Sequence, residues 1–117
     1  MQSRILVADD AEINRELLCN MLKDEYVIEM AEDGEQALVK LEKYQNETAA
    51  LLLDLQMPKM NGYDVLAEMK KKGWVKQIPV LIISGEEAVE AEKQCFELGV
   101  LDFIRKPFNA SVVKTRI

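Results

Sequence analysis

Five short apolar runs alternate with five amphipathic segments along the chain, and this alternation limits the fold more than any other feature. The apolar runs cover residues 4–8, 26–30, 49–55, 80–83 and 101–104. Each has the length of a strand, and the continuous apolar stretches of the first, third and fourth suit burial on both faces of a sheet. Strands that alternate with helices form right-handed βαβ units, so we predict an α/β fold with a doubly wound, five-stranded parallel sheet.

The segments between these runs carry apolar residues at helical spacing, which predicts helices with one inward face. In the first segment these residues are Ile13, Leu17, Leu18, Met21 and Leu22. We expect a turn at Asp33-Gly34, and Gly73 and Gly99 are placed to end the third and fourth helices. We expect a last helix from residue 110 that is cut short at residue 117.

Length and charge exclude several classes of protein. At 117 residues the chain is expected to form one domain over 1–117. No apolar run approaches the ~20 residues of a membrane span, and residues 5–8 are too few for a signal-peptide core, so we expect a cytoplasmic protein without membrane contact. The net charge of −6 argues against direct nucleic-acid binding. Histidine is absent, so any histidine chemistry must come from a partner.

Polar residues close the apolar stretches: Asp9 and Asp10 follow the first, Asp54 follows residues 49–53 within the third, and Ser84 and Lys106 come after the last two. In open α/β sheets ligands bind at the carboxyl ends of the strands, so these side chains are expected to meet. Taken singly, Asp9 or Asp10 could cap a helix and Asp54 could cap a loop. Taken together, the carboxylates suit a Mg²⁺ site, and Asp54 suits a nucleophile that accepts a phosphoryl group.

Four stretches together resemble the receiver domain of two-component response regulators. They read "ILVADD", "LLLDLQMPKMNGYDVL", "PVLIISG" and "GVLDFIRKPF" and extend over nearly the whole chain. The resemblance implies a flavodoxin-like fold with strand order 2-1-3-4-5. It also implies that Asp54 is the phosphoacceptor, and that Mg²⁺ is bound by Asp9, Asp10, Asp54 and the backbone carbonyl of Gln56.

The same resemblance assigns the remaining residues of the site. Lys106 is implied to sense the phosphoryl group, Ser84 to be the switch hydroxyl and Phe103 the switch aromatic, with a cis bond between Lys106 and Pro107. Phe103 lacks the hydroxyl of the tyrosine that is commoner there, so its switching would act by packing alone. Gln56 and Glu86 occupy the variable positions that tune the lifetime of the phosphoryl bond in this family.

The function implied is a signalling switch rather than an enzyme with an external substrate. A sensor histidine kinase or a histidine phosphotransfer protein would donate the phosphoryl group to Asp54. Phosphorylation of Asp54 would reshape the surface of the fourth helix, fifth strand and fifth helix, where a dimer could also form. A receiver that ends like this one is expected to precede a C-terminal output domain. By analogy with other receivers, this could be a domain that makes or degrades cyclic dinucleotides.

Three other classes remain open at this point. A small phosphatase with an aspartate nucleophile needs a second acid two residues on, where this chain has Gln56. A flavin site needs a phosphate-binding loop after the first strand, where Asp9 and Asp10 would repel phosphate. A docking module that keeps only the fold would not need the full set of acids, hydroxyl and lysine.

Overall fold

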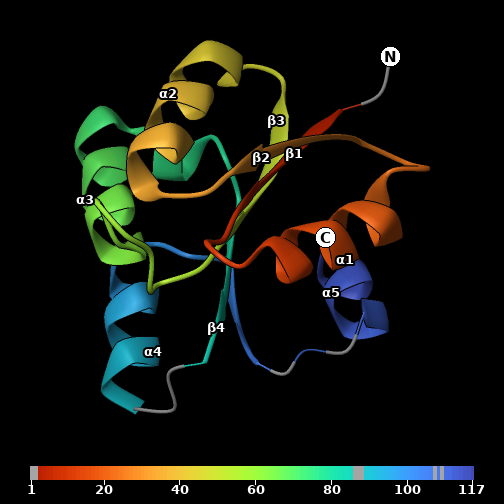
Figure 1. Ribbon diagram of the computed structural model, residues 1–117. Helices are drawn as coiled ribbons and strands as arrows, with labels where there is room; N and C mark the ends of the chain where they lie inside the picture. Colours follow the sequence, from red (N-terminus) through yellow and green to blue (C-terminus); the bar gives the residue numbers. More distant parts are fainter. Residues whose placement is uncertain (1–2, 86–88, 107, 109) are drawn as a thin grey trace.

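The computed structural model describes residues 3–85, 89–106, 108 and 110–117. Five parallel strands form one sheet in the order β2-β1-β3-β4-β5, which confirms the predicted fold class and strand order (Figure 1). The strands are β1 (Arg4–Ala8), β2 (Val27–Ala31), β3 (Thr48–Leu53), β4 (Val80–Ser84) and β5 (Asp102–Arg105). The helices are α1 (Glu12–Leu22), α2 (Gly34–Tyr44), α3 (Gly62–Lys72), the 3-10 turn η1 (Trp74–Lys76), α4 (Val89–Glu97) and α5 (Ala110–Arg116).

The helices cover both faces of the sheet and divide the core in two. In Figure 1, α2, α3 and α4 lie on one side, and α1 and α5 on the other. Successive strand residues point to opposite faces, so Leu51 and Leu53 pack under α2 to α4, while Ala50 and Leu52 pack under α1 and α5. The inner strands β1, β3 and β4 therefore need continuous apolar runs, as the sequence predicts.

Helix α1 departs from the prediction on its inward face. Leu18 and Leu22 are buried, but Ile13 is 68% and Leu17 53% exposed. A helix against a sheet buries one stripe, and here the stripe runs through Arg15, Leu18 and Leu22. Arg15 occupies the inward position, so the prediction that Ile13 and Leu17 face inward was wrong.

Local boundaries differ from the prediction by one or two residues. Asp33 and Gly34, predicted as a turn, are the N-cap and first residue of α2, because the Asp33 carboxylate accepts from the Gln36 N–H at 2.8 Å. Gly73 does end α3, with a φ of 79° that favours glycine. Among the described residues no helix combines the length and the apolar character needed to cross a membrane.

Candidate phosphoacceptor and metal site

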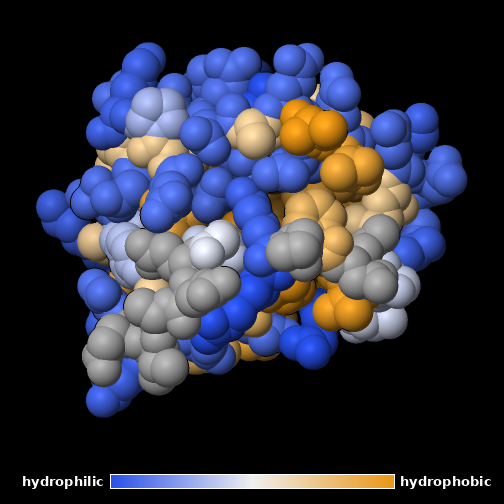
Figure 2. All heavy atoms as spheres, turned by 60° about the horizontal axis from the view of Figure 1, so that its bottom comes forward, coloured by the Kyte–Doolittle hydropathy of each residue, from blue (hydrophilic) through white to orange (hydrophobic). Residues whose placement is uncertain are grey.

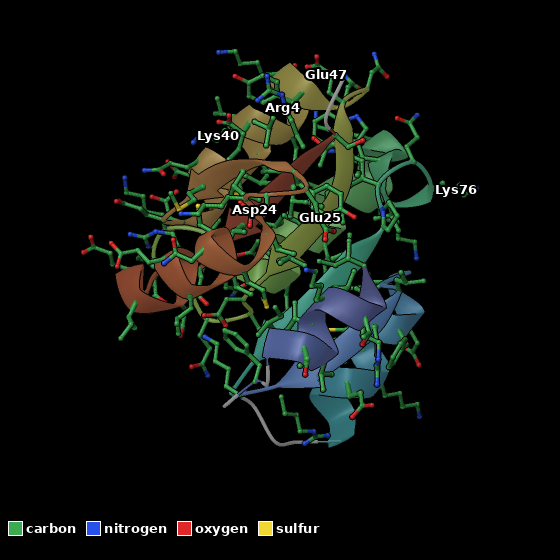
Figure 3. All side chains as sticks on the ribbon, turned by 90° about the vertical axis from the view of Figure 1, so that its right-hand side faces the viewer. Arg4, Asp24, Glu25, Lys40, Glu47 and Lys76 are labelled. Carbon is green, nitrogen blue, oxygen red and sulfur yellow. The ribbon has the colours of Figure 1, made fainter. Side chains whose placement is uncertain are left out.

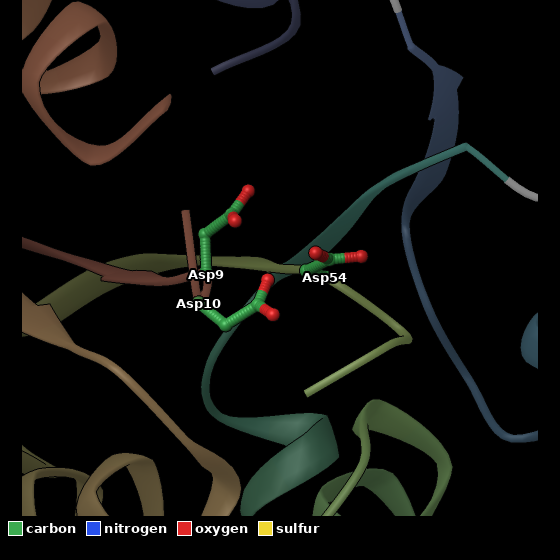
Figure 4. A group of neighbouring side chains, drawn as sticks. All are labelled: Asp9, Asp10 and Asp54. Atoms are coloured by element: carbon green, nitrogen blue, oxygen red, sulfur yellow. The ribbon is translucent and has the colours of Figure 1, made fainter. Parts of the chain in front are cut away.

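The carboxyl ends of β1 and β3 bring three acids to one edge of the sheet. The Asp9 N–H donates to the Ala31 carbonyl at 3.1 Å, and the Asp54 N–H donates to the Ala8 carbonyl at 2.9 Å. The hydrogen bonding between strands thus continues one residue past β1 and β3. It fixes Asp9 and Asp54 side by side at the carboxyl edge of the sheet. One oxygen from each of Asp9, Asp10 and Asp54 lies within 4.8 Å of the others (Figure 4).

Lys106 reaches these acids from the end of β5. Its backbone N–H donates to the Ser84 carbonyl at 2.8 Å, which continues the pairing of β4 with β5. Its Nζ lies 3.0 Å from an Asp54 oxygen and 3.1 Å from an Asp9 oxygen. One ammonium therefore bridges carboxylates that leave two neighbouring strands.

Burial makes the crowding of these charges costly. Asp9 and Asp54 are 2% and 4% exposed. Burial raises the pKa of the Asp54 carboxyl and the charge of Asp9 adds to this, whereas Lys106 and the Gln56 N–H act in the opposite direction. Burial alone would lower the pKa of Lys106, but its contacts with Asp54 and Asp9 outweigh this and raise it. The ammonium is held charged beside carboxylates that it does not fully compensate.

This donor set fits a hard divalent cation. Mg²⁺ prefers oxygen ligands and is held in proteins by one or two carboxylates, with waters and phosphate completing its shell. The three acids provide converging carboxylate oxygens, and one ammonium leaves the group with excess negative charge. Asp9, Asp10 and Asp54 are the residues that could hold the ion.

The loop after β3 packs its backbone closely against the site. The Gln56 N–H donates to an Asp54 carboxylate oxygen at 3.2 Å. The Gly62 N–H donates to the Leu55 carbonyl at 2.9 Å, and a Cβ on Gly62 would lie 2.5 Å from the Asp54 carbonyl oxygen. Only glycine fits this approach, so Gly62 shapes the loop that follows Asp54. The predicted ligand role of the Gln56 carbonyl stays a prediction.

Two residues of α1 that the sequence did not suggest also contact Asp9. The Arg15 guanidinium donates to the Asp9 backbone carbonyl at 2.7 Å, and the Asn14 amide lies 3.4 Å from an Asp9 carboxylate oxygen. The available signal was a charge on an apolar face, since Arg15 is spaced with Leu18 and Leu22. Such a side chain is normally exposed unless it has a buried partner.

The other residues assigned by resemblance lie around this edge. Ser84 is the last residue of β4 and is fully buried, and Phe103 of β5 is buried in the core under α2 to α4. Their predicted switch roles are not tested by this geometry. Glu86 and Pro107, and with Pro107 the expected cis bond, lie outside the described residues.

An apolar area adjoins the acidic edge. Figure 2 turns this edge toward the viewer and shows apolar side chains gathered on the side where Figure 1 draws α1 and α5. The exposed apolar residues on these two helices include Ile13, Leu17 and Val112. The acids are therefore flanked by a surface that could contact a partner.

Comparisons with known proteins agree with this geometry. A family model for the response regulator receiver domain matches residues 5–117. The chain is 38% identical over 115 residues to "Response regulator RR06" of Streptococcus pneumoniae, which covers 97% of this chain and 50% of that protein. It is 34% identical over 116 residues to "Probable cyclic di-GMP phosphodiesterase" of Vibrio cholerae. This alignment covers 99% of this chain and 26% of that protein.

A solved structure shows the same fold. A chain of the crystal structure of the CheX-CheY-BeF3-Mg²⁺ complex from Borrelia burgdorferi superimposes with a TM-score of 0.90 at 28% identity. The match covers 97% of this chain and 85% of that chain. In sequence, by contrast, the chain spans only half or less of the two curated relatives named above.

Proposed function

This chain belongs to the response regulator receiver domain family, and we propose that it is a switch controlled by phosphorylation of Asp54. Receiver domains act in two-component signalling, and phosphorylation and Mg²⁺ binding are general properties of the family. The observation that carries the proposal is the ion pair of Asp54 with Lys106 at 3.0 Å, beside two further carboxylates. A nucleophile, a cation for the transferred group and a metal-ligand set lie within one small volume.

The proposed reaction moves one phosphoryl group from a partner's histidine to Asp54. An Asp54 carboxylate oxygen attacks the phosphorus atom, and a P–O bond forms as the P–N bond breaks. The imidazole nitrogen leaves with the bonding electrons and takes up a proton. The 117 residues contain no histidine, so the donor histidine lies outside them.

The site residues act mainly by positioning and by charge. Asp54 is held by its backbone bond to Ala8 and by the Gln56 N–H. The Lys106 ammonium, which contacts Asp54 before transfer, stabilises the phosphoryl oxygens afterwards. A bound Mg²⁺ would supply further positive charge at the transferred oxygens.

The proposed output is a change in the surface formed by α4, β5 and α5. Ser84 and Lys106 stand at the ends of β4 and β5 and are joined by a backbone hydrogen bond. A phosphoryl group that draws the Ser84 hydroxyl and the Lys106 ammonium toward Asp54 would move both strand ends. Phe103 lies on β5 in the core under α2 to α4, so its packing would change with the end of that strand, and a dimer through this surface would respond to the change.

The partners proposed are a sensor histidine kinase or a histidine phosphotransfer protein upstream and an output domain downstream. Ile13 and Leu17 form an exposed apolar pair beside the acidic edge, which suits contact with an apolar helix face of the donor. The similarity to the Vibrio cholerae protein makes an enzyme of cyclic dinucleotides one proposed type of output domain.

The test is phosphorylation of the purified chain by acetyl phosphate, followed by intact mass. We expect one added phosphoryl group that requires Mg²⁺ and is absent from Asp54→Asn. Asp33→Asn is the matched control, because Asp33 is also a buried carboxylate near this edge but caps α2 instead. Equal labelling of wild type and Asp54→Asn would refute the proposal.

A further inference from the structure

We propose that Arg15 is a positioning residue of the metal site, which sets the direction in which Asp10 presents its carboxylate. This inference rests on the metal site proposed above. Arg15 is only 9% exposed, and its Nη1 donates to the Asp9 backbone carbonyl at 2.7 Å. A buried guanidinium is costly unless it is bonded, so this contact defines where the side chain lies.

The Asp9 carbonyl belongs to the same peptide unit as the Asp10 nitrogen. That unit is planar, so a bond that fixes the Asp9 oxygen also fixes the Asp10 N–H and the bond to the Asp10 Cα. Together with the φ torsion of Asp10, the orientation of this plane sets which way the Asp10 side chain leaves the backbone. Arg15 therefore acts on Asp10 without touching it.

Asp10 needs this indirect support. It is exposed, and within residues 3–85, 89–106, 108 and 110–117 no hydrogen bond or ion pair to its carboxylate is found. Asp9, in contrast, is held by the Ala11 N–H at 2.9 Å, by Asn14 and by Lys106. An exposed carboxylate brought within 4.8 Å of two others repels them and would turn to solvent if its backbone allowed.

Arg15 is itself held from a second element. Its Nη2 lies 3.7 Å from a carboxylate oxygen of Glu32, which follows β2, while Asp9 follows β1. The guanidinium thus connects α1 to the ends of two adjacent strands. Glu32 is largely exposed, so this ion pair is the weaker of the two contacts.

The experiment compares Mg²⁺ affinity and folding stability in the same variants. Mg²⁺ affinity is read from backbone amide NMR shifts during titration, and stability from urea unfolding without Mg²⁺. For Arg15→Met we expect Mg²⁺ affinity about tenfold lower, the scale for residues that orient metal ligands. Arg15→Lys keeps one donor toward the Asp9 carbonyl and should recover part of the affinity. Glu32→Gln should stay within about twofold of wild type because it leaves the stronger contact.

Arg4→Met is the matched control for a merely structural role. Arg4 is a partly buried arginine at the opposite edge of the sheet, paired with Glu29 at 3.0 Å. Its loss should lower stability and leave Mg²⁺ affinity unchanged. Arg15→Met with lower stability and wild-type Mg²⁺ affinity would overturn the inference.

Two further outcomes are decisive. If Arg15→Met does not fold, Arg15→Lys decides the matter, and a Mg²⁺ affinity equal to that of Glu32→Gln would overturn the inference. Wild type that binds no Mg²⁺ would refute the proposed metal site itself, which separates that failure from a failure of the role given to Arg15.

Discussion

The amino and carboxyl edges of the sheet differ in how their charged side chains are paired. At the amino edge, Arg4 pairs with Glu29 at 3.0 Å and with Glu47 at 3.7 Å, and its guanidinium stacks 4.1 Å from the centre of the Tyr44 ring. Figure 3 shows Arg4 and Glu47 close together at this end. At the carboxyl edge, three carboxylates meet one ammonium, and two of the carboxylates are buried.

This contrast separates a structural cluster from a reactive one. A hollow of about 440 Å³ lies at the amino edge, lined by residues that include Arg4, Glu47 and Thr48. Its charges already have partners, so the hollow has little to offer a ligand. The carboxyl edge retains excess negative charge and is therefore the edge expected to bind a cation.

The largest expected effect concerns backbone packing at the carboxyl edge. Gly62→Ala would place a Cβ 2.5 Å from the Asp54 carbonyl oxygen, so we expect the free energy of unfolding to fall by about 3 kcal/mol. Gly85→Ala is the control, since no described atom lies within 4 Å of its added Cβ. Urea unfolding measures both, and equal losses would show that the close approach at Gly62 is not rigid.

The next effect tests the difference in charge between the edges directly. Asp10→Asn removes one converging carboxylate and should weaken Mg²⁺ binding by at least about tenfold. Glu29→Gln removes a carboxylate from the paired amino edge and should leave Mg²⁺ binding unchanged. Isothermal titration calorimetry measures the Mg²⁺ affinity of both variants. A similar loss of affinity in Glu29→Gln would contradict the proposed difference between the two edges.

The pH dependence of stability gives a smaller effect. Burial raises the pKa of Asp54 above its ordinary value of 3.8, so the folded protein holds that proton more tightly than the unfolded chain. Stability is then lost as pH rises through the folded pKa. Asp54→Asn avoids this loss, and we expect it to be more stable than wild type by about 1 kcal/mol at pH 7.5 without Mg²⁺.

The gain of Asp54→Asn should shrink below the ordinary pKa of an aspartate, where wild-type Asp54 is protonated in both states. Urea unfolding at pH 7.5 and at acidic pH, with a chelator present, measures it. A variant that is less stable than wild type at pH 7.5 would mean that Lys106 compensates the Asp54 charge fully.

The smallest expected effect concerns Lys59, in the loop between β3 and α3 at the carboxyl edge. It tests whether backbone strain or the ion pair of this residue contributes more to stability. Lys59 has a φ of 66°, which favours glycine, and its Nζ lies 3.8 Å from an Asp33 oxygen. Lys59→Gly should raise the free energy of unfolding by about 0.5 kcal/mol, since the Lys59 ammonium is largely exposed and its ion pair is long and weak. Lys59→Ala loses the ion pair but keeps the strained backbone, so its stability should not exceed that of wild type. Thermal unfolding of both variants measures the difference.

Sequence patterns predicted the strands better than the helix faces. Residues 4–8 form β1 as predicted, because a buried parallel strand requires an unbroken apolar run. Ile13 and Leu17 were placed wrongly, because helical spacing alone does not show which of several apolar residues face the sheet. Asp9, Asp10 and Asp54 lie together as strand ends suggest, whereas the Arg15 contact depends on how α1 packs. The chemical roles of these residues stay predictions.

The hydrogen bond from Asp54 to Ala8 has a consequence for which changes of length this chain can accept. One residue inserted into β3 would invert the alternation of its side chains, so that Leu51 and Leu53 would exchange cores with Ala50 and Leu52. The same insertion would carry Asp54 about 3.3 Å along the strand, away from Lys106. Laboratory evolution of this domain should therefore accept insertions in its connecting loops and reject them between Thr48 and Asp54.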